Sequence, residues 1–146
     1  MRKTDRFVLD SYALLAWLED EVGAVVVSEI LTACRDGTAQ AWLSIINLGE
    51  TLYITEREQG LPAAQKVVAV VDQLPVRVID ADRPRTFAAA RIKARHPLSY
   101  ADAFAVALGQ EVGGSVVTGD PEFEKVEDLV PVVWLDHIDL PEPDPR

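Results

Sequence analysis

The sequence predicts an α/β fold of three layers, in which helices cover both faces of a mainly parallel sheet of four to five strands. Short apolar runs rich in valine and isoleucine, typical of buried strands, alternate with longer segments whose apolar residues recur at helical spacing. This alternation favours crossover connections, and therefore a parallel sheet. With 146 residues, 49% of them apolar, the chain is long enough for one domain with a sizeable core.

The first half of the chain opens with a short strand that ends at Asp10. Ser11 is expected to cap the helix that follows, in which apolar residues from Ala13 onward lie on one face. A triple valine in the next helix also suits a strand, so that assignment stays open. The elements predicted in this half are a strand at 6–9, a helix from 11, a helix at 22–35, a strand at 41–43, and helices at 45–59 and 61–73.

The second half continues the alternation. Either Asp80 or Asp82 is expected to cap a helix that ends before Pro97, because the residue ahead of a proline is disfavoured in a helix. Ser99 with Asp102 three residues later resembles a capping box, which predicts the start of another helix. The predicted strands are 76–79, 115–118 and 132–135.

Composition excludes several classes of function. The longest apolar runs, such as residues 67–71, are far shorter than the roughly 20 residues that span a bilayer. No secretory signal precedes Asp10, and the single cysteine, Cys34, indicates a packed thiol in a reducing cytoplasm. A net charge of −10 disfavours a broad basic surface for long nucleic acid, but it leaves open a small site where metal ions supply positive charge.

Four acids occupy unusual places in this pattern. Asp10 and Asp120 each follow a predicted strand, so they should lie at the same edge of a parallel sheet, where sites in such folds are found. Glu50 and Asp102 lie on helices, early in their elements. Taken singly, each has a simpler interpretation: Asp10, Asp102 and Asp120 as caps, and Glu50 as a solvated helix residue.

The neighbours of these acids favour a shared site. All four acids are flanked by apolar or small residues. Burying four carboxylates together is costly unless a cation holds them. Ligands that are all oxygen suit Mg²⁺ or Mn²⁺ rather than zinc.

Four segments carry a family resemblance: VLDSYALLAWL (8–18), INLGE (46–50), LSYADAFAVAL (98–108) and VVTGDPEF (116–123). They resemble the PIN-domain ribonucleases, and as a set they look like VapC-type toxins of toxin–antitoxin pairs. The resemblance covers nearly the whole chain in order. It implies one PIN-like domain over residues 1–140, which we expect to be followed by a flexible proline-rich acidic tail at 141–146.

The resemblance also implies roles for these residues. Asp10, Glu50, Asp102 and Asp120 correspond to the family's catalytic, metal-binding acids, with hydroxyls of Ser11 and Thr118 in support. The implied activity is an endoribonuclease that depends on Mg²⁺ or Mn²⁺ and leaves a 5′-phosphate and a 3′-hydroxyl. Such chemistry needs no histidine or cysteine nucleophile, and His96 and His137 lie outside every motif. One difference from the family is the bulky side chains of Tyr12 and Tyr100, at positions where many relatives carry smaller residues.

Candidate partners follow from the same resemblance and from charge. VapC-like proteins form homodimers, are inhibited by a cognate antitoxin and act on structured RNA such as tRNA or rRNA. A basic stretch ahead of Asp102 is a candidate for phosphate contacts, or else a solvated helix face. It comprises Arg83, Arg85, Arg91, Lys93 and Arg95.

Other functions remain open at this point. One is a PIN-like nuclease of RNA processing without an antitoxin, and another is a non-catalytic PIN-like module that binds RNA or protein. A phosphatase with an aspartate nucleophile typically needs Asp-x-Asp, whereas residues 10–12 read Asp-Ser-Tyr.

Overall fold

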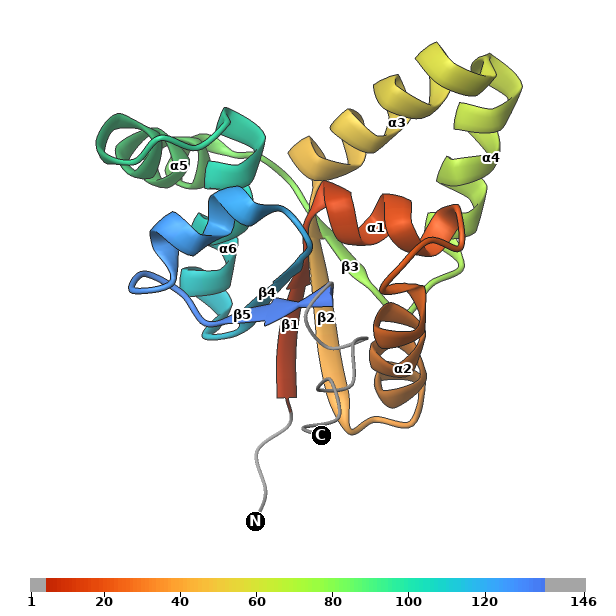
Figure 1. Ribbon diagram of the computed structural model, residues 1–146, viewed down its shortest axis with the longest axis horizontal. Coiled ribbons are helices and arrows are strands. Elements are labelled where there is room, and N and C mark those ends of the chain that lie inside the picture. The colour runs from red at the N-terminus through yellow and green to blue at the C-terminus, as the bar shows by residue number, and fades with distance from the viewer. Residues whose placement is uncertain (1–4, 136–146) are drawn as a thin grey trace, which may run out of the picture.

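The computed structural model describes residues 5–135 and confirms the α/β prediction (Figure 1). Five strands form one fully parallel sheet in the order β3-β2-β1-β4-β5. These strands are β1 (Asp5–Leu9), β2 (Ala39–Ser44), β3 (Arg77–Ile79), β4 (Ser115–Thr118) and β5 (Val132–Trp134). The first strand therefore lies at the centre of the sheet, and the residue that follows it opens onto the middle of the carboxyl edge.

Helices cover both faces, which gives the three predicted layers (Figure 1). One layer holds α1 (Ser11–Leu18), α2 (Ala24–Arg35), α3 (Ile45–Gln59) and α4 (Leu61–Asp72). The other holds α5 (Arg83–Arg95), α6 (Tyr100–Val112) and the short 3₁₀ helix η1 (Pro121–Val126). The 3₁₀ helix was not anticipated, because its six residues contain only two apolar side chains that reach the core, Phe123 and Val126.

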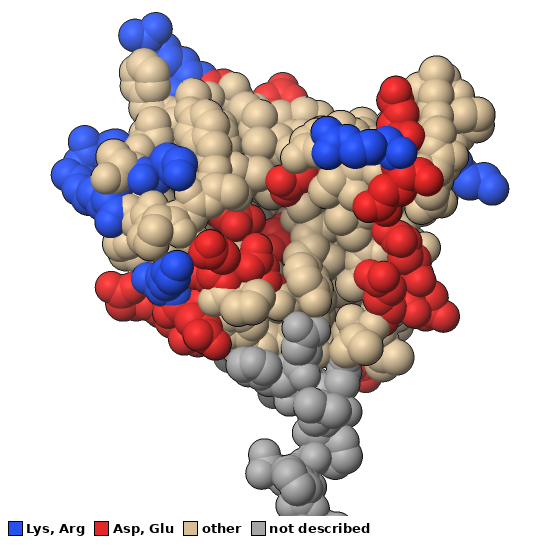
Figure 2. Space-filling model, turned by 45° about the horizontal axis from the view of Figure 1, so that its top comes forward, with Lys and Arg blue, Asp and Glu red and all other residues tan. Residues whose placement is uncertain are grey.

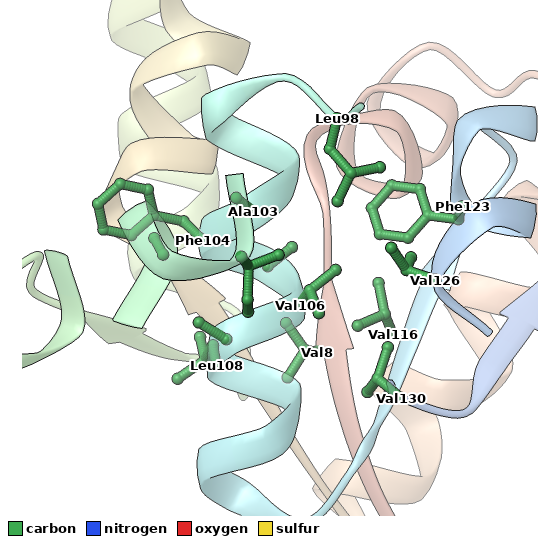
Figure 3. Packing of buried hydrophobic residues seen from close by; sticks show 14 of the residues in the cluster. Val8, Leu98, Ala103, Phe104, Val106, Leu108, Val116, Phe123, Val126 and Val130 are labelled. Atoms are coloured by element: carbon green, nitrogen blue, oxygen red, sulfur yellow. The ribbon is translucent and has the colours of Figure 1, made fainter. Parts of the chain in front are cut away.

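Successive residues of the central strands divide the core in two, because side chains alternate across a strand. Val8 and Val116 pack towards α5 and α6, whereas Leu9 and Val117 pack towards α1 to α4. Figure 3 shows the first of these clusters, where Leu98 and Phe123 meet between α6 and η1. Parallel strands buried on both faces read as unbroken apolar runs, as these do.

Helix α2 resolves the assignment that its valines left open. Val26 and Val27 are buried against the sheet while Val25 is exposed, the pattern of a helix with one apolar face. Burial of this face outweighs the modest preference of valine for strands.

The structure shows which residues cap α1, α5 and α6. The expectation that Ser11 caps α1 is wrong: Asp10 is the cap, and its carboxylate accepts a hydrogen bond from the backbone N–H of Ala13 at 2.8 Å. Its backbone is extended, which aims the carboxylate back over the first turn. At α5 the cap is Asp82 rather than Asp80, and at α6 the predicted Ser99 cap accepts from the N–H of Asp102.

Some predictions fall beyond the described residues. The domain end at residue 140, the tail at 141–146 and His137 lie outside 5–135. Within 5–135 no helix combines the length and the apolar character needed to cross a membrane.

Candidate active site

The strand pairing brings Asp10 and Asp120 to the same edge of the sheet. Leu9 pairs with Val117, so β1 and β4 end side by side. The N–H of Asp10 donates to the carbonyl of Val117 at 3.3 Å, which fixes Asp10 beside the chain that leads to Asp120. Figure 2 shows acidic side chains gathered in a hollow on this side of the molecule.

Asp10 is the most deeply buried of the four acids, with a side chain only 1% exposed. Burial is the main reason why its pKa rises to about 8, and the charges of Asp102 and Asp120 raise that pKa further. Hydrogen bonds from the Thr118 hydroxyl and the Ala13 N–H oppose the rise. In the metal-free protein Asp10 is therefore largely protonated at neutral pH.

Asp102, on the first turn of α6, is also buried. Its pKa rises to about 6, first because of burial and then because of the charge of Asp120, with Glu50 contributing more weakly. A hydrogen bond with Ser99 opposes the rise. These electrostatic couplings place all four predicted acids in one cluster.

Thr118, predicted to support the cluster, links two of its members. Its hydroxyl hydrogen-bonds the Asp10 carboxylate and accepts from the backbone N–H of Asp120 at 3.0 Å. The Asp120 carboxylate accepts from the N–H of Glu122 at 2.9 Å, which caps η1. Strand β4 and the turn after it thus orient both strand-end acids.

The hydrogen bonds found for the Ser11 hydroxyl within residues 5–135 lead to helix α3 rather than to an acid. Its buried hydroxyl donates to the backbone carbonyl of Asn47 on α3, and the Asn47 side-chain amide donates back to Ser11 Oγ, both at 3.2 Å. The same amide donates to the carbonyl of Ala101, next to Asp102, at 3.2 Å. Sequence reasoning missed Asn47, whose one signal was its place three residues ahead of Glu50.

Glu122 is a second residue that sequence reasoning missed. Its charge raises the pKa of Asp102, so it lies at the margin of the acidic cluster. Its carboxylate also forms an ion pair with Lys125 at 3.3 Å. The signal was its position two residues after Asp120, where η1 turns the chain back over the sheet edge.

Tyr12 bounds the cluster on the α1 side. Its ring packs directly on Gly119, so closely that a β-carbon added at Gly119 would lie 2.6 Å from the ring atom Cζ. The side chain is nevertheless 40% exposed. A bulky phenol thus lies against the residue that precedes Asp120.

The four carboxylates are suitable ligands for a divalent cation, but their side chains would have to move closer together to bind one. The four acids take part in none of the ion pairs found among residues 5–135, and carboxylate oxygens are the ligands that Mg²⁺ and Mn²⁺ prefer. As placed, however, no group of three acidic, histidine or cysteine side chains within those residues could hold an ion. Their side chains would have to draw together around a cation.

The basic stretch lies on α5, at one side of the acidic hollow (Figure 2). The Arg85 guanidinium donates two hydrogen bonds to the Glu111 carboxylate, and its Nη1 lies 2.7 Å from Oδ2 of Asp82. Its charge is therefore already paired within the protein. Arg83 lies over the ring of Phe87 at 4.9 Å. The other three, Arg91, Lys93 and Arg95, are exposed and belong to none of the ion pairs found in 5–135.

Comparisons with known proteins bear on this arrangement. VapBC2 from Rickettsia felis bound to a promoter DNA fragment aligns with a TM-score of 0.69 and 13% identity, over 90% of this chain and 99% of that one. DNA-bound VapBC from Salmonella typhimurium gives 0.69 and 19%, over 90% and 98%. VapC20 from Mycobacterium tuberculosis, described as a Sarcin–Ricin loop cleaving toxin, gives 0.64 and 21%, over 82% and 93%.

These likenesses are of fold, since identities are low, and no curated protein sequence matches the chain significantly. The sequence profile of the PIN domain matches residues 7–129, which include all four acids. That match spans most of the chain and agrees with the parallel sheet and the acids at its carboxyl edge. The chain belongs to the PIN domain family.

Proposed function

We propose that this protein is a metal-dependent endoribonuclease, the toxin of a VapBC-like toxin–antitoxin pair. One observation carries the proposal: Asp10 and Asp102 are buried beside Asp120 and Glu50, and their pKa values are raised. Such a cluster is unfavourable as four charges, and a bound cation offsets that cost. Membership of the PIN domain family supports the assignment.

The acids would hold the metal, with Asp10, Asp102 and Asp120 as direct ligands and Glu50 as a direct or water-mediated one. When bound, Mg²⁺ or Mn²⁺ neutralises the phosphodiester and makes a coordinated water a better nucleophile at neutral pH. The chain's own residues orient the ligands, and their hydrogen bonds oppose part of the rise that burial causes in the pKa of Asp10 and Asp102. Thr118 does part of this through its contacts with Asp10 and Asp120. By family resemblance, the products would carry a 5′-phosphate and a 3′-hydroxyl.

Structured RNA is the proposed substrate, in the form of tRNA or an rRNA loop. The description of VapC20 as a toxin that cleaves the Sarcin–Ricin loop supports this class. Arg91, Lys93 and Arg95, which belong to none of the ion pairs found in residues 5–135, could contact phosphates beside the site. Arg85 is a weaker candidate for such a contact because Glu111 and Asp82 already hold it.

A cognate antitoxin is the proposed protein partner, and a toxin–antitoxin complex from Klebsiella pneumoniae with a similar fold supports it. A groove of about 390 Å³ runs between α1, α3 and α4, with apolar Leu18, Val67 and Val70 in its lining. At its rim Glu19 has a raised pKa, through partial burial and then through the charges of Glu21 and Glu58. Lys66 lines the groove together with Glu19, so it is the apolar lining rather than a net charge that suits an amphipathic helix.

A homodimer is proposed chiefly on the family resemblance. The apolar residues of α3 and α4 offer limited support, because Val67 and Val71 are buried in the core while Tyr53 and Val68 are exposed. Light scattering at micromolar concentration should give twice the chain mass. A mass equal to one chain would refute the dimer.

Cleavage of purified total tRNA and rRNA tests the activity. Discrete products are expected with Mg²⁺ or Mn²⁺, and none with EDTA. Asp102→Asn should abolish cleavage, whereas Asp72→Asn, the same change at an exposed helix residue of α4, should not. Equal cleavage by wild type and Asp102→Asn, or cleavage that persists in EDTA, would refute the proposal.

A further inference from the structure

A buried asparagine joins the segments that carry the acids. Asn47 lies on α3 with none of its surface exposed, three residues ahead of Glu50. Its amide nitrogen donates to Ser11 Oγ and to the carbonyl of Ala101, each at 3.2 Å. Ser11 follows Asp10 in the chain, and Ala101 precedes Asp102.

The orientation of this amide follows from its partners. The Ala101 carbonyl can only accept, so the amide nitrogen must face it. The Ser11 hydroxyl gives its proton to the backbone carbonyl of Asn47, so it accepts from the amide nitrogen. One side chain therefore links the start of α1, the first turns of α3 and the start of α6.

We propose that Asn47 is a positioning residue that sets the spacing of Asp10, Glu50 and Asp102. The proposal rests on the proposed function, since it assumes that these acids bind a divalent metal. The two partners of the Asn47 amide, Ser11 and Ala101, are each one residue from an acid, and Asn47 precedes Glu50 by three residues on α3. Loss of these bonds would therefore let the three acid-bearing segments shift relative to one another. Partners that orient metal ligands from behind have large effects on affinity.

The hydrogen bonds of Asn47 indicate that stability is not its main contribution. Its side-chain oxygen is buried and has no hydrogen-bond partner among the described residues, which costs stability. Without the amide, Ser11 would keep its bond to the Asn47 backbone, and the Ala101 carbonyl lies within α6, where the helix supplies a donor. Replacement by leucine, which branches at the same atom, should thus leave no other buried group unpaired.

Thr51 provides a matched control on the same helix. It is also fully buried, and its hydroxyl donates to the same Asn47 carbonyl at 2.9 Å, but none of the hydrogen bonds found in residues 5–135 joins its side chain to α1 or α6. Thr51→Val removes a buried hydrogen bond of α3 at nearly constant shape. It should lower stability without altering the spacing of the acids.

The test is calorimetric titration of the full chain with Mn²⁺, together with thermal unfolding in EDTA. Asn47→Leu and Asn47→Ala should each weaken Mn²⁺ binding by about tenfold or more. Thr51→Val should bind Mn²⁺ like wild type, and its unfolding midpoint should fall at least as far as that of Asn47→Leu.

The outcomes separate this inference from the function beneath it. Wild-type Mn²⁺ affinity in both Asn47 variants would overturn the positioning role and leave the nuclease proposal intact. So would failure of both variants to fold, or an equal loss of affinity in Thr51→Val. A wild-type protein that neither binds Mn²⁺ nor cleaves RNA would overturn the proposed function and the inference together.

Discussion

The four acids of the site form two pairs that differ in their contact with water. The inner acids, Asp10 and Asp102, are buried, and their pKa values rise to about 8 and about 6. The outer acids, Glu50 and Asp120, are only half-buried. Water can stabilise the charge of the outer acids, whereas the inner acids need a proton or a cation.

This difference indicates a division of labour. Binding a metal must displace protons from the inner acids, so they couple metal affinity to pH and to stability. The outer acids can adjust their side chains at less cost, because they are less tightly packed. Substitutions of the two pairs should therefore have different consequences.

The largest effect is expected at Asp10. Asp10→Asn should reduce metal-dependent RNA cleavage by about 100-fold or more, because it removes a charged ligand that no neighbour replaces. It should also raise the unfolding midpoint in EDTA at pH 8, where the wild-type carboxylate is partly charged and buried. Cleavage assays and thermal unfolding measure both. An active variant, or one destabilised at pH 8, would contradict the inner role.

Glu50→Gln should have a smaller effect, about tenfold on cleavage, because Glu50 is proposed to act directly or through water. The unfolding midpoint in EDTA should change little, since this side chain is half-exposed. Asp10→Asn should be measured in the same assay. If Glu50→Gln lost as much cleavage as Asp10→Asn, the distinction between the inner and outer acids would be wrong.

The pH dependence of metal-free stability follows from the inner acids. A carboxyl whose pKa is raised on folding, as for Asp10 from 3.8 to about 8, binds more protons in the folded state. Its contribution to stability is fully present below the unfolded pKa and is lost as pH rises through the folded one. The wild-type unfolding midpoint in EDTA should fall between pH 6 and pH 8, and Asp10→Asn should flatten this fall. An equal slope in both proteins would refute the assignment.

The smallest effect is expected outside the acid pairs, on α5. Reversing charge with Arg91→Glu and Arg95→Glu should weaken RNA binding several-fold and flatten its salt dependence, as expected for lost phosphate contacts. Arg35→Glu with Lys66→Glu makes the same change in net charge on exposed positions of α2 and α4 and should have less effect. Equal losses in the two double variants would indicate general repulsion.

Local patterns were enough to place the acids. Asp10 and Asp120 follow apolar strands, and parallel strands share a carboxyl edge, so their proximity could be predicted without coordinates. The capping box at Ser99 likewise fixed Asp102 at the start of α6. These inferences used only neighbours in the chain.

Contacts between distant segments could not be predicted. Asn47 meets residues 36 and 54 positions away, and Arg85 pairs with a glutamate 26 positions away. Asp10 rather than Ser11 caps α1, and the hydrogen bond from its N–H to the Val117 carbonyl keeps its backbone extended at the end of β1. Such outcomes depend on packing, which periodicity and capping rules do not encode.

The contact between Tyr12 and Gly119 has a consequence for how this sequence can vary. Gly119 does not adopt a left-handed backbone, so its conformation alone does not demand glycine. The tyrosine ring fills the space that a β-carbon would need, so a larger residue at position 119 requires the partly exposed Tyr12 side chain to swing aside or to be replaced by a smaller one. Along a line of descent, the two positions should therefore vary together, with larger residues at 119 accompanying smaller ones at 12.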